Sequence, residues 1–198
     1  MMPGNVLSNP TLNSAFLAPR DVITKRPNPP NLYLPLTDYS IGGVGIDDPS
    51  QGLALKTWTA QVDGSGAVML SAAGVSPTTV FTRAGITWIG LAFDSNMKVF
   101  LTWLEAAGAF YRWFDSTVNN YTVSSLPAGS DHVFAQLDDT RPLESSTRDV
   151  LLHYMRGSHL FMRIQRDRYG VEYDLGLLTG LNLVQTGMNH TNRFQFQF

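Results

Sequence analysis

From Ile41 onward, short apolar segments alternate with turn-forming residues along the chain. The segments are rich in Val, Ile, Thr, Phe, Tyr and Trp, and Gly, Asn, Asp and Ser separate them. This pattern is typical of β-strands joined by tight turns. No segment of helical length has apolar residues at the i, i+3, i+4, i+7 spacing between helix start and stop signals. The pattern therefore predicts an all-β chain.

A hairpin pattern occurs twice. Val99–Trp113 aligns without a gap with Val150–Ile164 at a constant shift of 51 residues, and Trp103 matches Tyr154. A weaker version runs from Leu53 to Ala72 around the turn Asp63-Gly64-Ser65-Gly66. With the strands expected on either side, these hairpins predict three four-strand antiparallel meanders at 41–85, 86–129 and 130–176 within a β domain 41–176. A period of about 44–50 residues is typical of propeller blades, although closed propellers have about 4–8 of them. We expect a partial-propeller-like stack or a β-sandwich.

Both faces of these strands carry large apolar side chains. In 99–104, Val99, Leu101 and Trp103 occupy one face, while Phe100 and Leu104 occupy the other. A sheet that is half exposed to water alternates apolar and polar residues. We therefore expect both faces to be covered.

Residues 1–40 have a different character. Eight of the 11 prolines lie in the first 49 residues, and proline favours extended backbone. Apolar residues such as Phe16, Leu32, Tyr33 and Leu34 are too frequent here for a solvated linker. The segment reads as an extended N-terminal arm, lying either over its own domain or on a neighbouring subunit.

The C-terminal segment 177–198 ends in a strict two-residue alternation, Arg193-Phe194-Gln195-Phe196-Gln197-Phe198. A strand with three Phe on one face must add to a sheet of its own chain or of a neighbour. The arm and this C-terminal strand predict the following assembly contacts: Phe16, Leu32, Tyr33, Leu34, Arg193, Phe194, Phe196 and Phe198.

Composition narrows the classes of function. The 198 residues include 14 Lys and Arg, 16 Asp and Glu, and no Cys, for a formal net charge of −2. The chain cannot form a disulfide or a Cys-ligated metal site, and its charge argues against neutralising many phosphates of a nucleic acid. No apolar run reaches the ~18–20 residues of a membrane-spanning helix, and the first residues lack a secretory signal. We expect no membrane partner, no nucleic-acid partner and a cytoplasmic place of assembly.

The sequence offers few candidate metal-binding or catalytic residues. Of the four His, a turn at Arg156-Gly157 would place His153 and His159 on opposite faces of a hairpin, so we expect no metal site. Asp47-Asp48, Asp94-Ser95 and Asp138-Asp139 could be calcium or catalytic carboxylates, but their recurrence after each predicted strand favours a turn-shaping role. Arginines between 141 and 168 lie among acidic residues, which favours ion pairs and subunit contacts over DNA contact. No phosphate-binding loop or nucleophile elbow is present, so we expect no cofactor and no catalytic residue.

The third meander carries a familiar set of segments. These are 137–139, 149–157 and 161–170, preceded by 91–97 and 126–129. Over about residues 41–175 they resemble a family of virion structural proteins of tailed bacteriophages. The resemblance implies a non-enzymatic, tail-associated component of the phage particle, and it carries no catalytic or ligand residues.

These observations lead to one expected function and two alternatives. We expect a structural subunit of a phage tail or neck that assembles with copies of itself and with neighbouring virion proteins. A receptor- or glycan-binding module of a tail fiber is the first alternative, with Trp58, Trp88, Trp103 or Trp113 as exposed platforms, although Trp in such strands is more often core. A propeller-type glycan hydrolase is the second, and it needs a carboxylate pair in a pocket.

Overall fold

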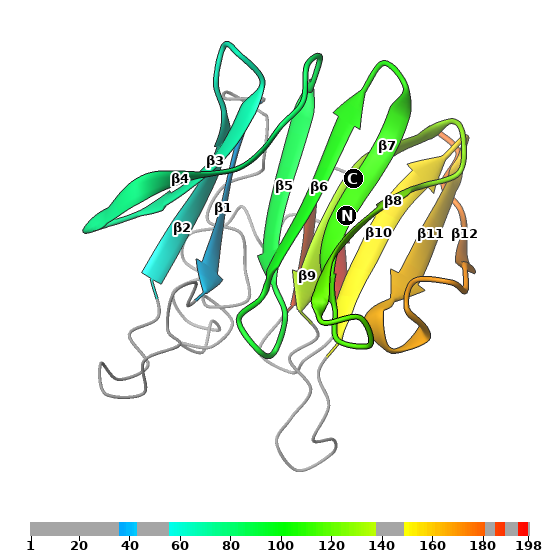
Figure 1. The fold of residues 1–198 in the computed structure, drawn as a ribbon. Coiled ribbons are helices and arrows are strands. Elements are labelled where there is room, and N and C mark those ends of the chain that lie inside the picture. The colour runs from blue at the N-terminus through cyan, green and yellow to red at the C-terminus, as the bar shows by residue number, and fades with distance from the viewer. Residues whose placement is uncertain (1–35, 43–55, 138–148, 181–184, 189–193, 198) are drawn as a thin grey trace, which may run out of the picture.

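The described part of the chain is built from β-strands. The computed structural model describes residues 36–42, 56–137, 149–180, 185–188 and 194–197 (Figure 1). Within these ranges the helical structure is a single 3₁₀ turn, η3 (Gln165–Asp167). The all-β prediction is confirmed.

Twelve of the strands form three antiparallel four-strand meanders. The first sheet contains β1 (Thr37–Gly42), β2 (Lys56–Val62), β3 (Ala67–Ala72) and β4 (Val75–Thr82). The second contains β5 (Trp88–Phe93), β6 (Val99–Glu105), β7 (Gly108–Asp115) and β8 (Asn120–Ser125). The third contains β9 (Ser130–Leu137), β10 (Val150–Arg156), β11 (His159–Ile164) and β12 (Tyr173–Leu177).

The predicted hairpin repeat corresponds to β6–β7 and β10–β11. Glu105 pairs with Gly108 in the first hairpin, and Arg156 pairs with His159 in the second, so the two hairpins keep the same register. The turn of the second hairpin is therefore Gly157-Ser158, and the predicted turn at Arg156-Gly157 was wrong. The positive φ of Gly157 (61°) places the glycine where a left-handed turn residue is needed.

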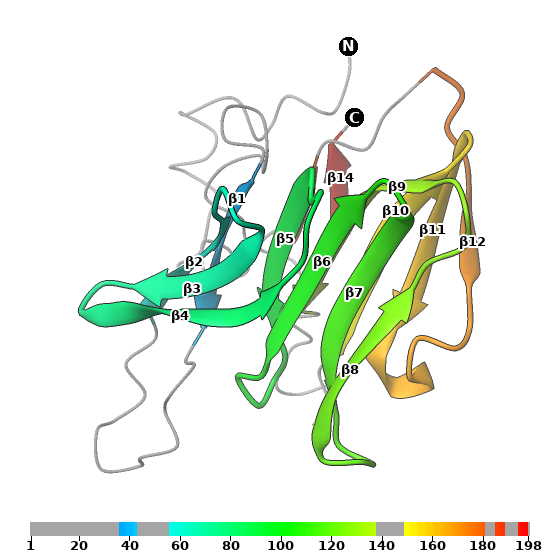
Figure 2. The same cartoon turned by 45° about the horizontal axis from the view of Figure 1, so that its top comes forward.

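Neighbouring sheets lie face to face like adjoining propeller blades. The first strands β1, β5 and β9 lie next to one another in chain order, and the remaining strands of each sheet fan outward to β4, β8 and β12 (Figure 2). Side chains tie these first strands together. Asp38 Oδ2 on β1 accepts the Leu91 N–H of β5 at 2.7 Å, and Trp88 Nε1 of β5 donates to the Val133 carbonyl of β9 at 3.2 Å.

Two hydrophobic cores fill the spaces between the three sheets. The first joins β2 and β3 to β5 and β6 and includes Trp58, Leu70, Leu91 and Trp103. The second joins the middle sheet to the third and includes the following aromatic residues: Phe100, Tyr111, Trp113, Tyr154, Phe161 and Tyr169. The middle sheet is thus covered on both faces, as its sequence predicts.

The two end sheets finish the stack differently. On β2, the buried Trp58, Ala60 and Val62 alternate with Thr57, Thr59 and Gln61, which are exposed or half-buried, so this strand turns polar side chains to the free face of the first sheet. A smaller core of Phe134, Met155 and Leu160 lies on the far face of the third sheet.

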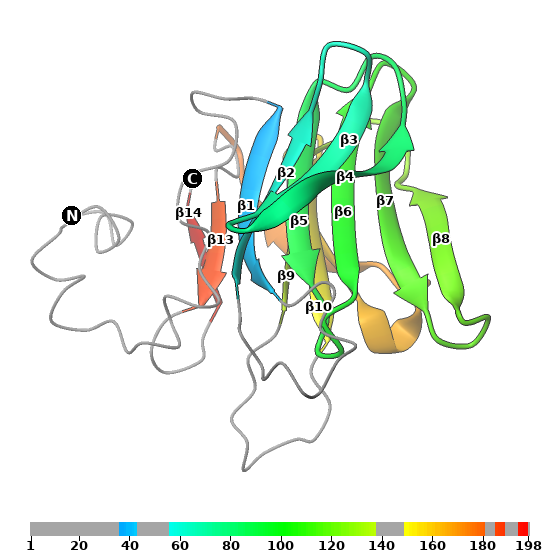
Figure 3. The ribbon, with the colours of Figure 1, turned by 60° about the vertical axis from the view of Figure 1, so that its left-hand side comes forward.

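The C-terminal strands form a separate two-stranded sheet. β13 (Gln185–Met188) pairs antiparallel with β14 (Phe194–Gln197), and β13 contacts β9 (Figure 3). The terminal strand thus pairs within its own chain. At the other end, residues 1–35 of the predicted arm lie outside the described residues. Residues 37–40 belong to β1, so the sheet domain begins earlier than the predicted boundary at 41.

Candidate functional site

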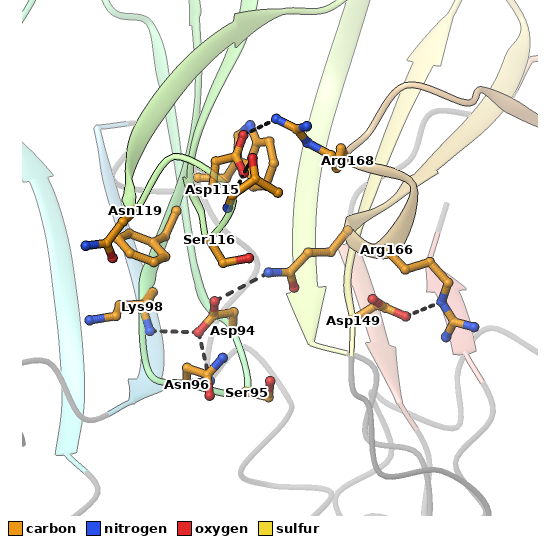
Figure 4. A pocket seen from close by; sticks show the side chains of 14 residues that line it. Asp94, Ser95, Asn96, Lys98, Asp115, Ser116, Asn119, Asp149, Arg166 and Arg168 are labelled. Carbon is orange, nitrogen blue, oxygen red and sulfur yellow. Dashed lines mark hydrogen bonds and ion pairs between the residues drawn. The ribbon is translucent and has the colours of Figure 1, made fainter.

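A polar cavity of about 800 Å³ lies between the second and third sheets, at one end of their strands. Its walls are the loop after β5 (residues 94–98), the loop after β7 (residues 115–119), Asp149 and η3 with the residue that follows it. Figure 4 shows Asp94, Asp115 and Asp149 on these segments with Arg166 and Arg168 close by. The cavity gathers three carboxylates and three cationic side chains.

Asp94 organises the loop after β5. Its Oδ1 accepts the N–H groups of Asn96 at 2.9 Å and Lys98 at 2.8 Å, which closes the turn back into β6. Its Oδ2 accepts a longer bond from Gln165 Nε2 of the third sheet, at 3.4 Å. The turn-shaping interpretation of Asp94 agrees with this geometry. Asp47-Asp48 and Asp138-Asp139 lie outside the described residues.

Asp115 plays the same part in the loop after β7. Its Oδ1 accepts the Thr117 hydroxyl at 2.7 Å and the Thr117 N–H at 3.0 Å, and its Oδ2 accepts a bond from Arg168 of the third sheet. The Thr117 hydroxyl bond is the main reason that the pKa of Asp115 lies below its ordinary value. Asp149 is paired in turn with Arg166, whose Nε lies 2.5 Å from Oδ2.

All three carboxylates are therefore engaged by the protein itself. Asp94 and Asp115 bind donors that fix their own loops and also reach across to η3 and the residue after it, while Asp149 pairs with Arg166. Because Lys98, Arg166 and Arg168 balance the three negative charges, the cavity has no formal excess charge. This arrangement is suited to holding the loops of the second and third sheets together.

A sequence signal could have revealed Asp115. Asp63-Gly64-Ser65 and Asp115-Ser116-Thr117 both place a hydroxyl two residues after an Asp, and in both the Asp Oδ1 accepts the N–H and the hydroxyl of that residue. Asp115 does not lie at the repeat position that Asp47, Asp94 and Asp138 share, so the repeat alone does not reveal it.

A network of two arginines and a tyrosine surrounds Glu172. Arg156 donates two bonds to its carboxylate, at 2.9 and 2.7 Å, and Arg163 adds a third at 3.4 Å. The Tyr154 hydroxyl donates to the same carboxylate, and burial raises the pKa of that hydroxyl. The Arg156 bonds, helped by Tyr154, hold the pKa of Glu172 at about 2. The expectation of ion pairs among Arg156, Arg163, Arg166 and Arg168 is thus met, while Arg141 and Arg148 lie outside the described residues.

His153 and His159 do not converge. His153 pairs with Met162 and is fully buried, while His159 pairs with Arg156, stacks on Phe161 and lies 2.9 Å from Asp174 Oδ2. The strand alternation puts the two rings on opposite faces of the third sheet. Among the residues that the structure places, no group of three or more His, Asp or Glu converges in a way that could hold a metal ion. The same residues include no helix long and apolar enough to span a membrane.

The tryptophans proposed as platforms are mostly internal. Trp58, Trp103 and Trp113 are buried in the two main cores, and Trp88 is half-buried with its indole N–H bonded to Val133. Three of the four side chains therefore cannot serve as exposed platforms.

The predicted assembly contacts are only partly placed. Phe194 and Phe196 lie on β14, in register with Met188 and Thr186 of β13. Phe16, Leu32, Tyr33, Leu34, Arg193 and Phe198 lie outside the described residues, so their role remains a prediction.

Replacing Asp94 by Ala is expected to lower the free energy of unfolding by about 2 kcal/mol, because a buried carboxylate loses two backbone donors and one amide donor. Asp94→Asn keeps one oxygen acceptor and should lose about half as much. Urea unfolding measures both values. Asp63→Ala is the matched control, since it removes the same turn bonds at a partly exposed hairpin and should cost less. Equal losses at Asp63 and Asp94 would contradict a role for Asp94 in joining the sheets.

Comparisons with protein-family models, with curated proteins and with solved structures find no match to this chain.

Proposed function

We propose that this chain is a structural subunit of a bacteriophage virion, associated with the tail or neck. It assembles in the host cytoplasm with copies of itself and with neighbouring virion proteins. The proposal rests on the resemblance over about residues 41–175 and on one structural observation that supports it. The three blades form an open stack, whereas propellers that act alone close a ring of about four or more blades.

The internal chemistry supports the same proposal. Charged residues of the cavity between the second and third sheets hold loops in place, and the Glu172 network holds β10, β11 and the segment before β12 together. These are the contacts of a rigid building element. A glycan-binding fiber module is the less favoured function, because three of its four proposed Trp platforms are buried.

The proposal is tested by locating the chain in particles. Antibodies raised against the purified chain should label purified virions at the tail or neck in electron micrographs, and the chain should co-purify with particles in fixed stoichiometry. Its absence from purified particles would overturn the proposal.

A C-terminal truncation tests how the chain is incorporated. Removing residues 193–198 should abolish incorporation into particles, while the circular dichroism spectrum and thermal transition of the three meanders persist, because β14 belongs to none of their ladders. A control in which Gln195 and Gln197 are replaced by Ser keeps the apolar alternation and should be incorporated normally. Normal incorporation of the truncated chain would contradict the predicted role of this strand.

A further inference from the structure

One arginine of the second sheet has no carboxylate partner. Six arginines lie in the described part of the chain, and five of them form an ion pair with an Asp or Glu of the same chain. The sixth, Arg112 on β7, forms none with the described residues, although it is half-buried. Burying a charge without a counter-ion costs free energy. The described chain thus leaves the charge of Arg112 uncompensated. The five paired residues are Arg83, Arg156, Arg163, Arg166 and Arg168.

Arg83 shows what a carboxylate partner does on the same face of this sheet. Its guanidinium lies over the ring of Phe110, with Cζ 4.8 Å from the ring centroid, and donates two bonds of 2.7 Å to Glu105. Phe110 and Arg112 are two positions apart on β7, so they share a face. The bonds to Glu105 raise the pKa of Arg83, whereas burial lowers the pKa of Arg112. The two arginines have similar aromatic surroundings and differ in the carboxylate.

An aromatic ring holds the Arg112 guanidinium in place. Its Cζ lies 3.6 Å from the centroid of the Tyr121 ring on β8. The Tyr121 hydroxyl accepts the Val99 N–H at 3.3 Å, and the Tyr121 ring packs against Phe114 in a T-shaped pair. A second cation, Lys98 Nζ, lies 5.0 Å from the centroid of Phe114. We call this group the Arg112 site: Lys98, Arg112, Phe114 and Tyr121.

The acidic residues next to the Arg112 site are engaged elsewhere. Asp115 lies on the opposite face of β7 and binds Arg168, and Glu105 binds Arg83. β8 contains no charged residue. Lys98, like Arg112, forms no ion pair with any residue that the structure places. The site therefore presents uncompensated positive charge, although the whole chain has a formal net charge of −2.

The Arg112 site is open to solvent beside an apolar side chain. Val123 pairs directly with Arg112 in the β7–β8 ladder, so the two side chains lie on the same face. Val123 exposes 51% of its surface. A ligand that reaches the Arg112 guanidinium would therefore also contact an aliphatic side chain.

We propose that Arg112 binds a carboxylate of another protein, supplied by an Asp or Glu side chain that lies beside an apolar residue. The guanidinium fork matches a carboxylate through two parallel N–H···O bonds, as in the Arg83–Glu105 pair. Lys98, beyond the two rings, offers its charge to a second acidic side chain of the same segment. This inference rests on the proposed function, since it names the chemistry that a neighbouring virion protein presents.

Two other anions fit the Arg112 site less well. A phosphate ester carries nearly two negative charges on one group, whereas a single guanidinium balances one, and the excess charge would lie beside Tyr121 and Val123. An acidic sugar carries the right charge, but its ring is covered with hydroxyl groups that gain nothing from the exposed Val123. A peptide provides both a carboxylate and an aliphatic side chain.

The direct test follows the arginine side chains of the full chain by NMR. The probe is the blocked tripeptide Glu-Leu-Glu, and its analogue Gln-Leu-Gln is the control at the same ionic strength. The Glu peptide should shift the Arg112 Nε–H resonance, which is identified by its loss in Arg112→Met, with half-saturation at about 1–10 mM, the range of a weak contact. The Gln peptide should leave it unchanged.

Three outcomes of this titration would overturn the inference. They are an Arg112 resonance that does not move at saturating solubility of the Glu peptide, equal shifts with both peptides, and tighter binding of inorganic phosphate or glucuronate than of the Glu peptide. The last outcome would assign the Arg112 site to a different anion.

Variants separate binding from folding. Arg112→Met should weaken binding of the Glu peptide at least tenfold, and Arg112→Lys, which keeps the charge but not the fork, should weaken it several-fold. Arg83→Met is the matched control, because it removes an arginine from a ring of the same face but breaks an existing ion pair. It should lower the urea midpoint more than Arg112→Met does and bind the peptide as wild type does. Unchanged peptide binding by Arg112→Met would overturn the inference.

The two proposals fail separately. A chain that is found in virions but whose Arg112 resonance ignores the Glu peptide retains the proposed function and loses this inference. A chain that binds the Glu peptide through Arg112 but is absent from virions keeps the carboxylate site and loses the proposed function.

Discussion

Replacing Gly66 by Ala should destabilise the chain by about 3 kcal/mol or more. Gly66 ends the turn between β2 and β3 with φ of +83°, a backbone conformation that costs an L-residue roughly 1–2 kcal/mol. A Cβ atom there would also lie 2.4 Å from the Arg83 carbonyl oxygen, and backbone cannot move aside as a side-chain tip can. The same backbone is tied to Gly66, since the Arg83 N–H donates to the Gly66 carbonyl at 2.8 Å.

Alanine variants of two other glycines separate the cost of backbone strain from the cost of a steric clash at the added Cβ. Gly74 also has a positive φ, of +75°, but a Cβ there meets nothing within 4 Å, so Gly74→Ala should cost only the strain of about 1 kcal/mol. Gly64 has neither problem, and Gly64→Ala should be close to neutral. Urea unfolding of the three variants should give losses in the order 66, 74, 64. A Gly66→Ala loss no larger than that of Gly74→Ala would mean that the Arg83 backbone does not limit the space.

The second large effect is expected at Glu172. Glu172→Gln should lower the free energy of unfolding at neutral pH by about 2 kcal/mol. It leaves Arg156, Arg163 and the Tyr154 hydroxyl without the carboxylate that they share. A fully buried pair would lose about 3–5 kcal/mol, and partial exposure of Glu172 reduces this figure. Glu105→Gln is the control for a single ion pair. Glu105 is less exposed than Glu172, at 7% against 24%, but bonds one arginine, Arg83, so a smaller loss there would show that the shared network and not burial sets the cost.

The Glu172 contribution should disappear in acid. The pKa of Glu172 is about 2 in the folded chain, below its ordinary value of 4.5. Its stabilisation is therefore fully present above pH 4.5 and is lost as the pH falls toward 2. The difference in unfolding free energy between wild type and Glu172→Gln should be constant at higher pH and shrink across this window. A difference that stays constant down to pH 2 would show that the loss comes from packing and not from the charge.

The most accurate predictions of the fold came from local sequence patterns. The β6–β7 and β10–β11 hairpins follow from alternation and turn residues that lie within about 15 neighbouring positions, and both form at the repeated register. The covered faces of the middle sheet were also predictable, since a strand that is apolar on both sides needs two neighbours. The start of β1 was missed because Pro35 and its neighbours resemble an arm as much as the approach to a strand.

The side-chain contacts that join the second and third sheets could not be predicted from local sequence patterns. Arg168 bonds Asp115 across 53 residues of sequence, and Gln165 bonds Asp94 across 71. Both partners come together only because η3 places them at the end of the second sheet, and Arg168 itself adopts a left-handed backbone, with φ of 51°. Sequence alternation reports which face of a strand is buried, but it does not report which loops of different sheets meet.

The order of the blades along the chain also bears on how the protein forms during synthesis. Every meander is a run of hairpins between neighbouring strands, and each face-to-face contact joins a sheet to the one made just before it. A ribosome releases about 5–20 residues per second, and amino-terminal regions emerge first. Each new sheet can therefore dock on a finished predecessor, and the β13–β14 pair, which follows the three meanders in the chain, can settle beside β9 after them.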